Sequence, residues 1–228
     1  MRVAVTGAGG RIGRHVVADL LAHDHEVMAV DRIAASGELA VNGATWVQAD
    51  VRDPEAIARF LDGARAEAVI HLAAIPSPRF GTQFEVFATN TQATFAVLEA
   101  AGMAGVPRVA IASSTSVTGL PFASPPVSPL YVPVDEGHPN IGNDQYALSK
   151  ETDEATARTM HRRHGYQVVA LRIPTPQPWR SSSRSRLMWL RTPPVSPANC
   201  GPTSMSAMAL ERSAWRSNAT SRAAASST

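Results

Sequence analysis

Lysine and cysteine are the two residue types that this chain of 228 residues nearly lacks. Lys150 is the only lysine, so 20 of the 21 basic residues are arginine, and the one ammonium side chain marks a position that needs it. Cys200 is the only cysteine, which excludes an internal disulfide and fits a reducing compartment.

Long apolar runs and a signal segment are also missing. No apolar stretch reaches membrane-spanning length, and the first residues enter a short apolar strand rather than a charged and then apolar leader. Four histidines, His23, His25, His161 and His164, form no metal-binding pattern, and we interpret them as surface residues. We therefore expect a cytoplasmic protein with no membrane partner and no bound metal.

The charge is divided unevenly between two segments. Residues 1–174 contain 14 Lys/Arg and 18 Asp/Glu, a net charge of −4, whereas residues 175–228 contain seven Arg and one Glu, a net charge of +6. The formal charge of +2 is thus an average of unlike parts, and it does not indicate nucleic-acid binding. We place a domain boundary at residue 174.

The second segment has the composition of a tail. It holds 12 serines, six prolines and three of the four tryptophans, without a sustained helical or alternating pattern. We expect residues 175–228 to be poorly ordered and to lack a specific site. Two origins stay open: a natural disordered tail, or a change of reading frame in a GC-rich gene, which would also deplete lysine.

The beginning of the chain carries the pattern of a phosphate-binding turn. Arg2–Val5 is an apolar run typical of a buried strand, and Gly7, Gly10 and Gly13 follow it directly. Apolar residues then recur at helical spacing up to Leu21. A glycine turn between a strand and a helix lets backbone N–H groups approach the pyrophosphate of a dinucleotide, and the helix N-terminus stabilises the anion.

An acid stands where a dinucleotide's ribose is expected. The second strand, Glu26–Val30, ends at Asp31, which is 18 residues after Gly13 and near the spacing of the ribose-binding acid. A carboxylate would repel the additional phosphate of NADP, so Asp31 predicts NAD. Arg32 leaves an alternative, because an arginine at this edge can accommodate that phosphate.

Strands and helices alternate along the first 174 residues. Further strands are predicted at 45–48, 68–72, 108–113 and 167–173, and helices at 54–61, 83–104 and 143–164, with a proline-rich loop at 121–139. This alternation predicts the α/β class, as a doubly wound, Rossmann-like parallel sheet with helices on both faces. Cofactor and chemistry are then expected at the carboxyl ends of the strands.

The single lysine lies one helical turn after a tyrosine. Tyr146 and Lys150 are four residues apart, so both side chains lie on one face of the predicted helix. A nearby cation stabilises tyrosinate, which makes a phenol usable as an acid or base. The same spacing also occurs by chance on solvated helices, so the pair alone does not decide its role.

Together these patterns resemble the extended short-chain dehydrogenase/reductases of the NAD-dependent epimerase/dehydratase family. The residues that carry the resemblance, in the family's order over residues 1–174, are Thr6-Gly7-x-x-Gly10-x-x-Gly13, Asp31, Asp50-Val51, His71-Leu72-Ala73-Ala74, Asn90, Ser113 to Gly119, Tyr146-x-x-x-Lys150 and Leu171-Arg172-Ile173-Pro174.

The resemblance implies a role for each matched residue in cofactor binding. The glycine turn, with Arg11 and Ile12, would hold the pyrophosphate; Asp50 and Val51 would hold the adenine; Ala73 and Ala74 would be small so that the backbone can approach the cofactor; and Asn90 would support the site from within. Two alternatives stay open: Asp50 belongs to the N-cap region of the helix at Pro54, and Asn90 is a surface helical residue.

The resemblance also implies a catalytic set of three residues. Ser114 would bind the reacting hydroxyl or carbonyl, with Ser113 and Thr115 as competitors for that role. Tyr146 would transfer the proton, and Lys150 would bind the nicotinamide ribose. The Thr-Asp-Glu run of the family's dehydratases is absent here, and Thr118 stands where many epimerases have tyrosine.

The implied activity is NAD-dependent oxidoreduction at a hydroxyl-bearing carbon of a carbohydrate-derived substrate, by an epimerase or a dehydrogenase. The family's C-terminal substrate region is replaced or truncated after residue 174. The alternative is therefore a dinucleotide-binding protein without turnover. Family members commonly pair through their two long helices, so we expect a homodimer through residues 83–104 and 143–164.

Overall fold

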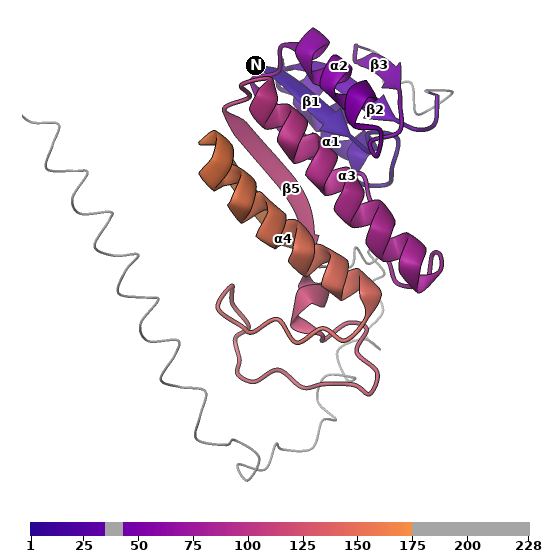
Figure 1. Ribbon diagram of the computed structural model, residues 1–228, viewed down its shortest axis with the longest axis vertical. Coiled ribbons are helices and arrows are strands. Elements are labelled where there is room, and N and C mark those ends of the chain that lie inside the picture. Colours follow the sequence, from indigo (N-terminus) through magenta and orange to yellow (C-terminus); the bar gives the residue numbers. More distant parts are fainter. Residues whose placement is uncertain (35–42, 175–228) are drawn as a thin grey trace, which may run out of the picture. The chain divides into compact units, whose positions relative to one another are not determined.

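The computed structural model describes residues 1–34 and 43–174 (Figure 1). The expectations for the tail at 175–228 lie outside the described residues, so the boundary at 174 stays a prediction. Within the described ranges, no helix is both long and apolar enough to cross a bilayer.

Six parallel strands form a single sheet in the order β3-β2-β1-β4-β5-β6. The strands are β1 (Arg2–Thr6), β2 (Glu26–Asp31), β3 (Thr45–Gln48), β4 (Ala68–His71), β5 (Arg108–Ser114) and β6 (Gln167–Ile173). The order reverses between β1 and β4, which is the place where open α/β sheets bind their ligands. The predicted doubly wound sheet is confirmed, with each predicted strand within one residue of its observed bounds.

In the part of the chain that the structure describes, four α-helices connect these strands. They are α1 (Gly13–Ala22), α2 (Pro54–Ala64), α3 (Gln83–Met103) and α4 (Gln145–His164). The predicted start of α4 at Asn143 was two residues early, because Asp144 caps the helix and its carboxylate accepts from the backbone N–H groups of Tyr146 and Ala147. The proline-rich stretch at 121–139 contains no regular element, as predicted.

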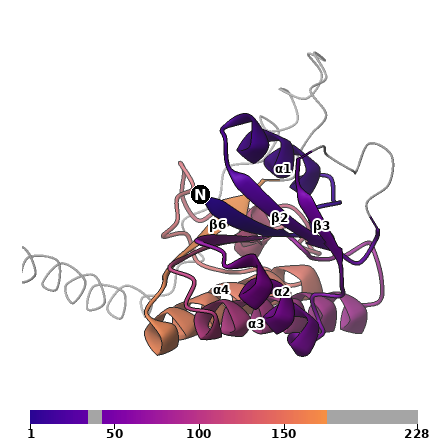
Figure 2. The ribbon, with the colours of Figure 1, turned by 90° about the horizontal axis from the view of Figure 1, so that it is seen from above.

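The helices cover the two faces of the sheet unequally. Figure 2 shows α1 on one face and α2, α3 and α4 on the other. The larger core cluster lies beneath those three helices and includes Ile57, Leu61 and Leu98, while a smaller one lies beneath α1. On β6, alternate residues pack against the larger cluster, but Val169 and Leu171 face the other way and remain 49% and 52% exposed.

Candidate active site

The turn after β1 brings backbone segments into direct contact. Gly7 has φ 67°, and a Cβ there would lie 2.6 Å from the backbone nitrogen of Ala73. A Cβ on Gly13 would overlap the carbonyl oxygen of Gly7. The amide of Gly10 donates to the Gly7 carbonyl at 3.0 Å. Glycine is required at these positions because neighbouring backbone occupies the space of a side chain.

A pocket of about 280 Å³ opens beside this turn at the carboxyl ends of the central strands. It brings together seven of the predicted cofactor residues: Gly7, Gly10, Asp31, Asp50, Val51, Ala73 and Ala74. Six others do not line it, among them Tyr146 and Lys150 in α4. Arg11 and Ile12 lie in the turn, Gly13 begins α1, and Asn90 is buried in α3.

Asp31 contacts the glycine turn through its carboxylate. One oxygen accepts from the amide of Gly9 at 3.0 Å, and the other accepts from the amide of Ile33 at 3.2 Å. Arg32 lines the same pocket. The carboxylate therefore lies in the pocket next to the turn that would hold a pyrophosphate, which is the arrangement that the ribose role requires.

Asp50 forms an ion pair at the rim of the pocket. Nη2 of Arg52 lies 2.6 Å from Oδ2 of Asp50, and Nε of Arg52 also donates to the carboxylate. The hydrogen bond from Arg52 lowers the pKa of Asp50 despite its partial burial, so the carboxylate remains an acceptor. The N-cap residue of α2 is Asp53, and Asp50 lies in the turn before it, where its backbone carbonyl accepts from the amide of Asp53.

Asn90 is fully buried and joins two segments of the site. Its amide side chain accepts from the backbone N–H of Ile75 at 2.8 Å, donates to the carbonyl of the same residue, and donates to Oγ of Ser149 at 3.0 Å. Asn90 thus links the loop after β4 to α4 through these hydrogen bonds. Its reading as a surface residue is wrong.

Tyr146 and Lys150 share a buried face of α4. The Lys150 Nζ lies 6.0 Å from the centre of the Tyr146 ring, and the ring of Phe122 packs edge-on against that of Tyr146. Nζ donates to the carbonyl of Ala112 in β5 at 3.0 Å and to Oδ2 of Asp153 at 3.1 Å. The helix therefore holds the phenol and the ammonium near the carboxyl end of β5.

The two serines at the end of β5 have different partners. The hydroxyl of Ser113 donates to Glu154 at 2.6 Å. The hydroxyl of Ser114 donates to Oγ of Ser116 at 2.9 Å and accepts from its amide, within the 3-10 helix η2 (Thr115–Thr118). The carbonyl of Val117 in η2 accepts from the amides of Ile141 and Gly142, just before α4. The Ser113 hydroxyl is thus already bound to Glu154, and Ser114 is the better candidate for binding substrate.

The family model of the NAD dependent epimerase/dehydratase family matches residues 3–177. The chain belongs to this family. The resemblance inferred from the sequence motifs is therefore confirmed.

Curated relatives in the family include enzymes of two kinds. The chain is 32% identical over 177 residues to an L-arabinose 1-dehydrogenase (NAD(P)(+)) of Haloferax volcanii, covering 75% of this chain and 66% of the relative. It is 28% identical over 181 residues to a UDP-glucose 4-epimerase of Bacillus subtilis, covering 75% and 51%. The chain thus spans about half to two thirds of the length of these relatives.

Solved structures in the family share the fold. A UDP-glucose 4-epimerase from Thermotoga maritima with UDP-glucose superposes with a TM-score of 0.68 at 26% identity, covering 75% of this chain and 55% of that one. A UDP-glucose 4-epimerase from Thermus thermophilus in complex with NAD gives a TM-score of 0.65 at 30% identity, covering 75% and 54%.

This family member also contains a buried network that the sequence did not reveal. Nε of Arg172 in β6 donates to Glu154 at 2.9 Å, and Nη2 of Arg172 donates to Asn140 at 3.0 Å. Burial acts against the charge of Glu154, but hydrogen bonds from Arg172 and Ser113 lower its pKa. The network joins β5, α4 and β6, and Arg172 within the quoted Leu171-Arg172 motif was its only signal in the sequence.

His71 lies in the core at the end of β4. Its Nδ1 is 2.7 Å from the hydroxyl of Thr6 and its Nε2 is 3.2 Å from the hydroxyl of Thr94. Burial, with a smaller contribution from the charge of Lys150, lowers the pKa of His71 to about 3. The imidazole is therefore neutral in the folded protein at ordinary pH.

We expect this histidine to make the protein less stable in acid. The unfolded chain binds a proton at His71 below about pH 6.5, but the folded chain does so only near pH 3, so acid favours unfolding. Between pH 7 and pH 5 the loss is about 2 kcal/mol. Urea unfolding at both pH values should show this loss reduced in His71→Gln. The exposed His15→Gln should retain the wild-type loss, and an equal loss in all three proteins would contradict the assignment.

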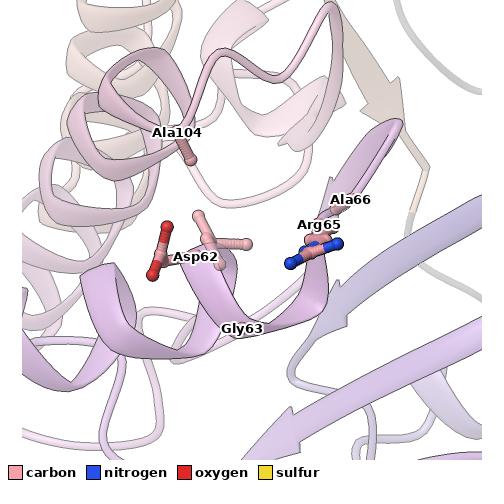
Figure 3. Close-up of a pocket in the computed structure, with 6 residues that line it drawn as sticks. Asp62, Gly63, Arg65, Ala66 and Ala104 are labelled. Atoms are coloured by element: carbon pink, nitrogen blue, oxygen red, sulfur yellow. The ribbon is translucent and has the colours of Figure 1, made fainter.

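A hollow of about 490 Å³ lies away from these residues (Figure 3). It is lined by the end of α2 and by Ala104, the residue that ends α3, together with Arg65 and Ala66 just before β4. This is the edge where the strands begin, and none of the predicted site residues lines it. It therefore lies at the opposite end of the sheet from the candidate site.

Proposed function

We propose that this protein uses NAD to oxidise or reduce a hydroxyl-bearing carbon of a sugar or sugar-nucleotide type substrate, as an epimerase or a dehydrogenase. The observation that carries the proposal is the pairing of Tyr146 with Lys150 on a buried face of α4, at the same sheet edge as the glycine-lined pocket. Backbone, rather than side chains, forms the wall of that pocket at Gly7 and Ala73, which supports the close approach of a dinucleotide.

Each catalytic residue has a distinct task in this proposal. The nicotinamide, when bound, supplies the hydride chemistry. The Tyr146 hydroxyl exchanges a proton with the substrate oxygen, and the Ser114 hydroxyl donates a hydrogen bond to that oxygen. Lys150 donates two N–H bonds to the Ala112 carbonyl and Asp153, which leaves one N–H of its ammonium for a ribose hydroxyl.

The names of the relatives support a carbohydrate-derived substrate, because they include a pentose dehydrogenase and nucleotide-sugar epimerases. The sequence Ser114-Thr115-Ser116 offers no carboxylate at the position where dehydratases need one, which disfavours elimination of water. A second candidate function is dinucleotide binding without turnover. This second function is favoured because the chain covers only about half to two thirds of the length of these relatives.

A turnover assay separates these two functions. Sugars, sugar acids and sugar nucleotides are incubated with NAD while the absorbance of NADH is followed, and epimerisation is followed by product analysis. Turnover of any of them supports the enzyme. Tight NAD binding with no turnover across the panel supports the binding protein.

We expect NAD to bind about tenfold or more tightly than NADP, because Asp31 would repel the additional phosphate. Calorimetric titration of both cofactors tests this expectation. Asp31→Ala should narrow the difference, whereas Glu26→Ala, at the other end of the same strand, should preserve it. Tighter binding of NADP by the wild type would refute the role of Asp31 and favour Arg32.

We also expect a homodimer through α3 and α4, which pack side by side (Figure 1). Large apolar side chains on these helices are exposed: Phe84 by 80%, Phe95 by 52%, Met103 by 75% and Leu148 by 51%. Burying them in a partner would remove apolar surface from water. Light scattering at micromolar concentration should give twice the chain mass, and Phe95→Asp should give a monomer. A monomeric wild type would contradict this arrangement.

The cytoplasmic location stays a prediction.

A further inference from the structure

The ammonium of Lys150 is neutralised inside the core by a residue that no sequence motif singled out. Asp153 lies one turn further along α4, with its Oδ2 3.1 Å from the Lys150 Nζ, and the two side chains are only 4% and 2% exposed. Burial raises the pKa of Asp153, and the charge of Lys150 opposes that rise. A buried ammonium without a counter-charge is costly, so the contact with Asp153 stabilises the Lys150 side chain at its place in the core.

The adjacent acid does not compete for this role. Glu154 is fully engaged by the guanidinium of Arg172 and the hydroxyl of Ser113. The helix turns by about 100° between successive residues, so the side chains of the two acids point in different directions and contact different elements. Asp153 therefore serves Lys150, while Glu154 serves β5 and β6.

The ion pair continues into a row of buried polar groups. The Thr94 hydroxyl interacts with the Asp153 carboxylate and opposes the rise in pKa that burial causes, although Oδ1 of Asp153 has no partner with full hydrogen-bond geometry among the described residues. Thr94 contacts His71, and His71 contacts Thr6, at 3.2 Å and 2.7 Å. Thr6 is the last residue of β1, directly before Gly7.

Because His71 is neutral, the hydrogen-bond donors and acceptors along this row follow one order. A neutral imidazole has one donor and one acceptor nitrogen. If Thr94 donates toward the Asp153 carboxylate, it accepts from Nε2 of His71, and Nδ1 of His71 then accepts from the Thr6 hydroxyl. Thr6, His71 and Thr94 each have a partner in this arrangement, which runs from the glycine turn through β4 to α3.

We propose that Asp153 is a positioning residue for Lys150, and that the row Thr6–His71–Thr94–Asp153 couples the placement of the ammonium to the cofactor turn. The proposal rests on the proposed role of Lys150 at the cofactor. The geometry that carries it is the buried contact of Asp153 with the ammonium, together with the contacts of His71 that lead from Thr94 to Thr6, next to Gly7.

The single lysine makes this proposal directly measurable. In the full chain labelled with [15N]lysine, Lys150 is the only side chain that gives an Nζ signal. Ammonium protons that are buried and hydrogen-bonded exchange slowly with water, so the wild type should show one Nζ cross-peak without any ligand. Asp153→Asn should remove or shift that cross-peak and raise the Kd for NAD about tenfold, the change expected when a hydrogen bond to a charged group is lost.

Two further variants sharpen the test. Glu151→Gln removes an acid next to Lys150 that does not contact the ammonium, and it should leave the cross-peak and the Kd unchanged. Thr94→Val interrupts the row at a residue that does not line the cofactor pocket. It should shift the cross-peak and raise the Kd about threefold, and it keeps the test decisive if Asp153→Asn does not fold.

The outcomes are separable from those of the proposed function. A wild type that does not bind NAD would overturn the proposed function, while the cross-peak of the free protein still tests Asp153. A lower melting temperature of Asp153→Asn with an unchanged cross-peak would mean that Asp153 is merely structural and would overturn the proposal. An unchanged cross-peak and Kd in Thr94→Val would overturn the coupling through the row.

Discussion

Tyr146→Phe is expected to lower turnover by about 10²–10⁴-fold while NAD binding stays almost unchanged. The phenylalanine ring can retain the edge-on packing against Phe122 and the position one turn before Lys150. Only the transferable proton is lost, and that proton is the one that acid–base catalysis needs. Turnover is followed through NADH absorbance, and NAD binding by calorimetry.

The chain offers a matched control for this substitution. Tyr131→Phe also removes one phenol hydroxyl, but that hydroxyl donates to Asp135 in the exposed proline-rich loop. Its turnover should equal that of the wild type. If Tyr146→Phe were as active as Tyr131→Phe, the assignment of Tyr146 would be wrong.

Gly13→Ala is expected to disrupt the glycine turn and to weaken NAD binding about 100-fold. The new methyl group would overlap the carbonyl oxygen of Gly7 and lie 2.8 Å from the Cα of Ala8. Both obstacles are backbone atoms, so the turn itself must open. We expect a loss of about 3 kcal/mol in the free energy of unfolding, at the upper end of the range for overpacked sites.

Urea unfolding and calorimetric titration with NAD measure the two effects. Gly63→Ala is the control, because a Cβ on this glycine of α2 has no atom within 4 Å. Replacing an unhindered helical glycine should stabilise the protein by about 0.5–1 kcal/mol. Similar results for the two alanine variants would show that the turn at Gly13 tolerates a side chain.

The secondary structure and the class of fold followed from the sequence because their causes are local. Apolar runs of strand length alternate with helical spacing in Arg2–Leu21, and the same alternation continues to Ile173. The glycine turn was also predictable, because its backbone geometry needs glycine at fixed positions. The start of α4 was missed by two residues because a capping carboxylate, rather than the helical pattern, sets it.

Where two adjacent residues of similar chemistry could take the same role in the site, only the tertiary structure shows which of them takes it. Two adjacent serines and two adjacent acids gave no local reason to choose between them. The fold made the choice, by directing Ser113 and Glu154 toward Arg172's network and Asp153 toward Lys150.

The tertiary structure also decided which residues line the candidate cofactor pocket. The motif places Arg11 and Ile12 in the turn, but it does not specify which side chains face the pocket. The sequence by itself determined the strands, the helices, the glycine turn and the spacing of Tyr146 and Lys150, because each depends on residues near one another in the chain. Only the tertiary structure decided which polar groups pair inside the core, since those partners come from different elements and a buried polar group without a partner is costly.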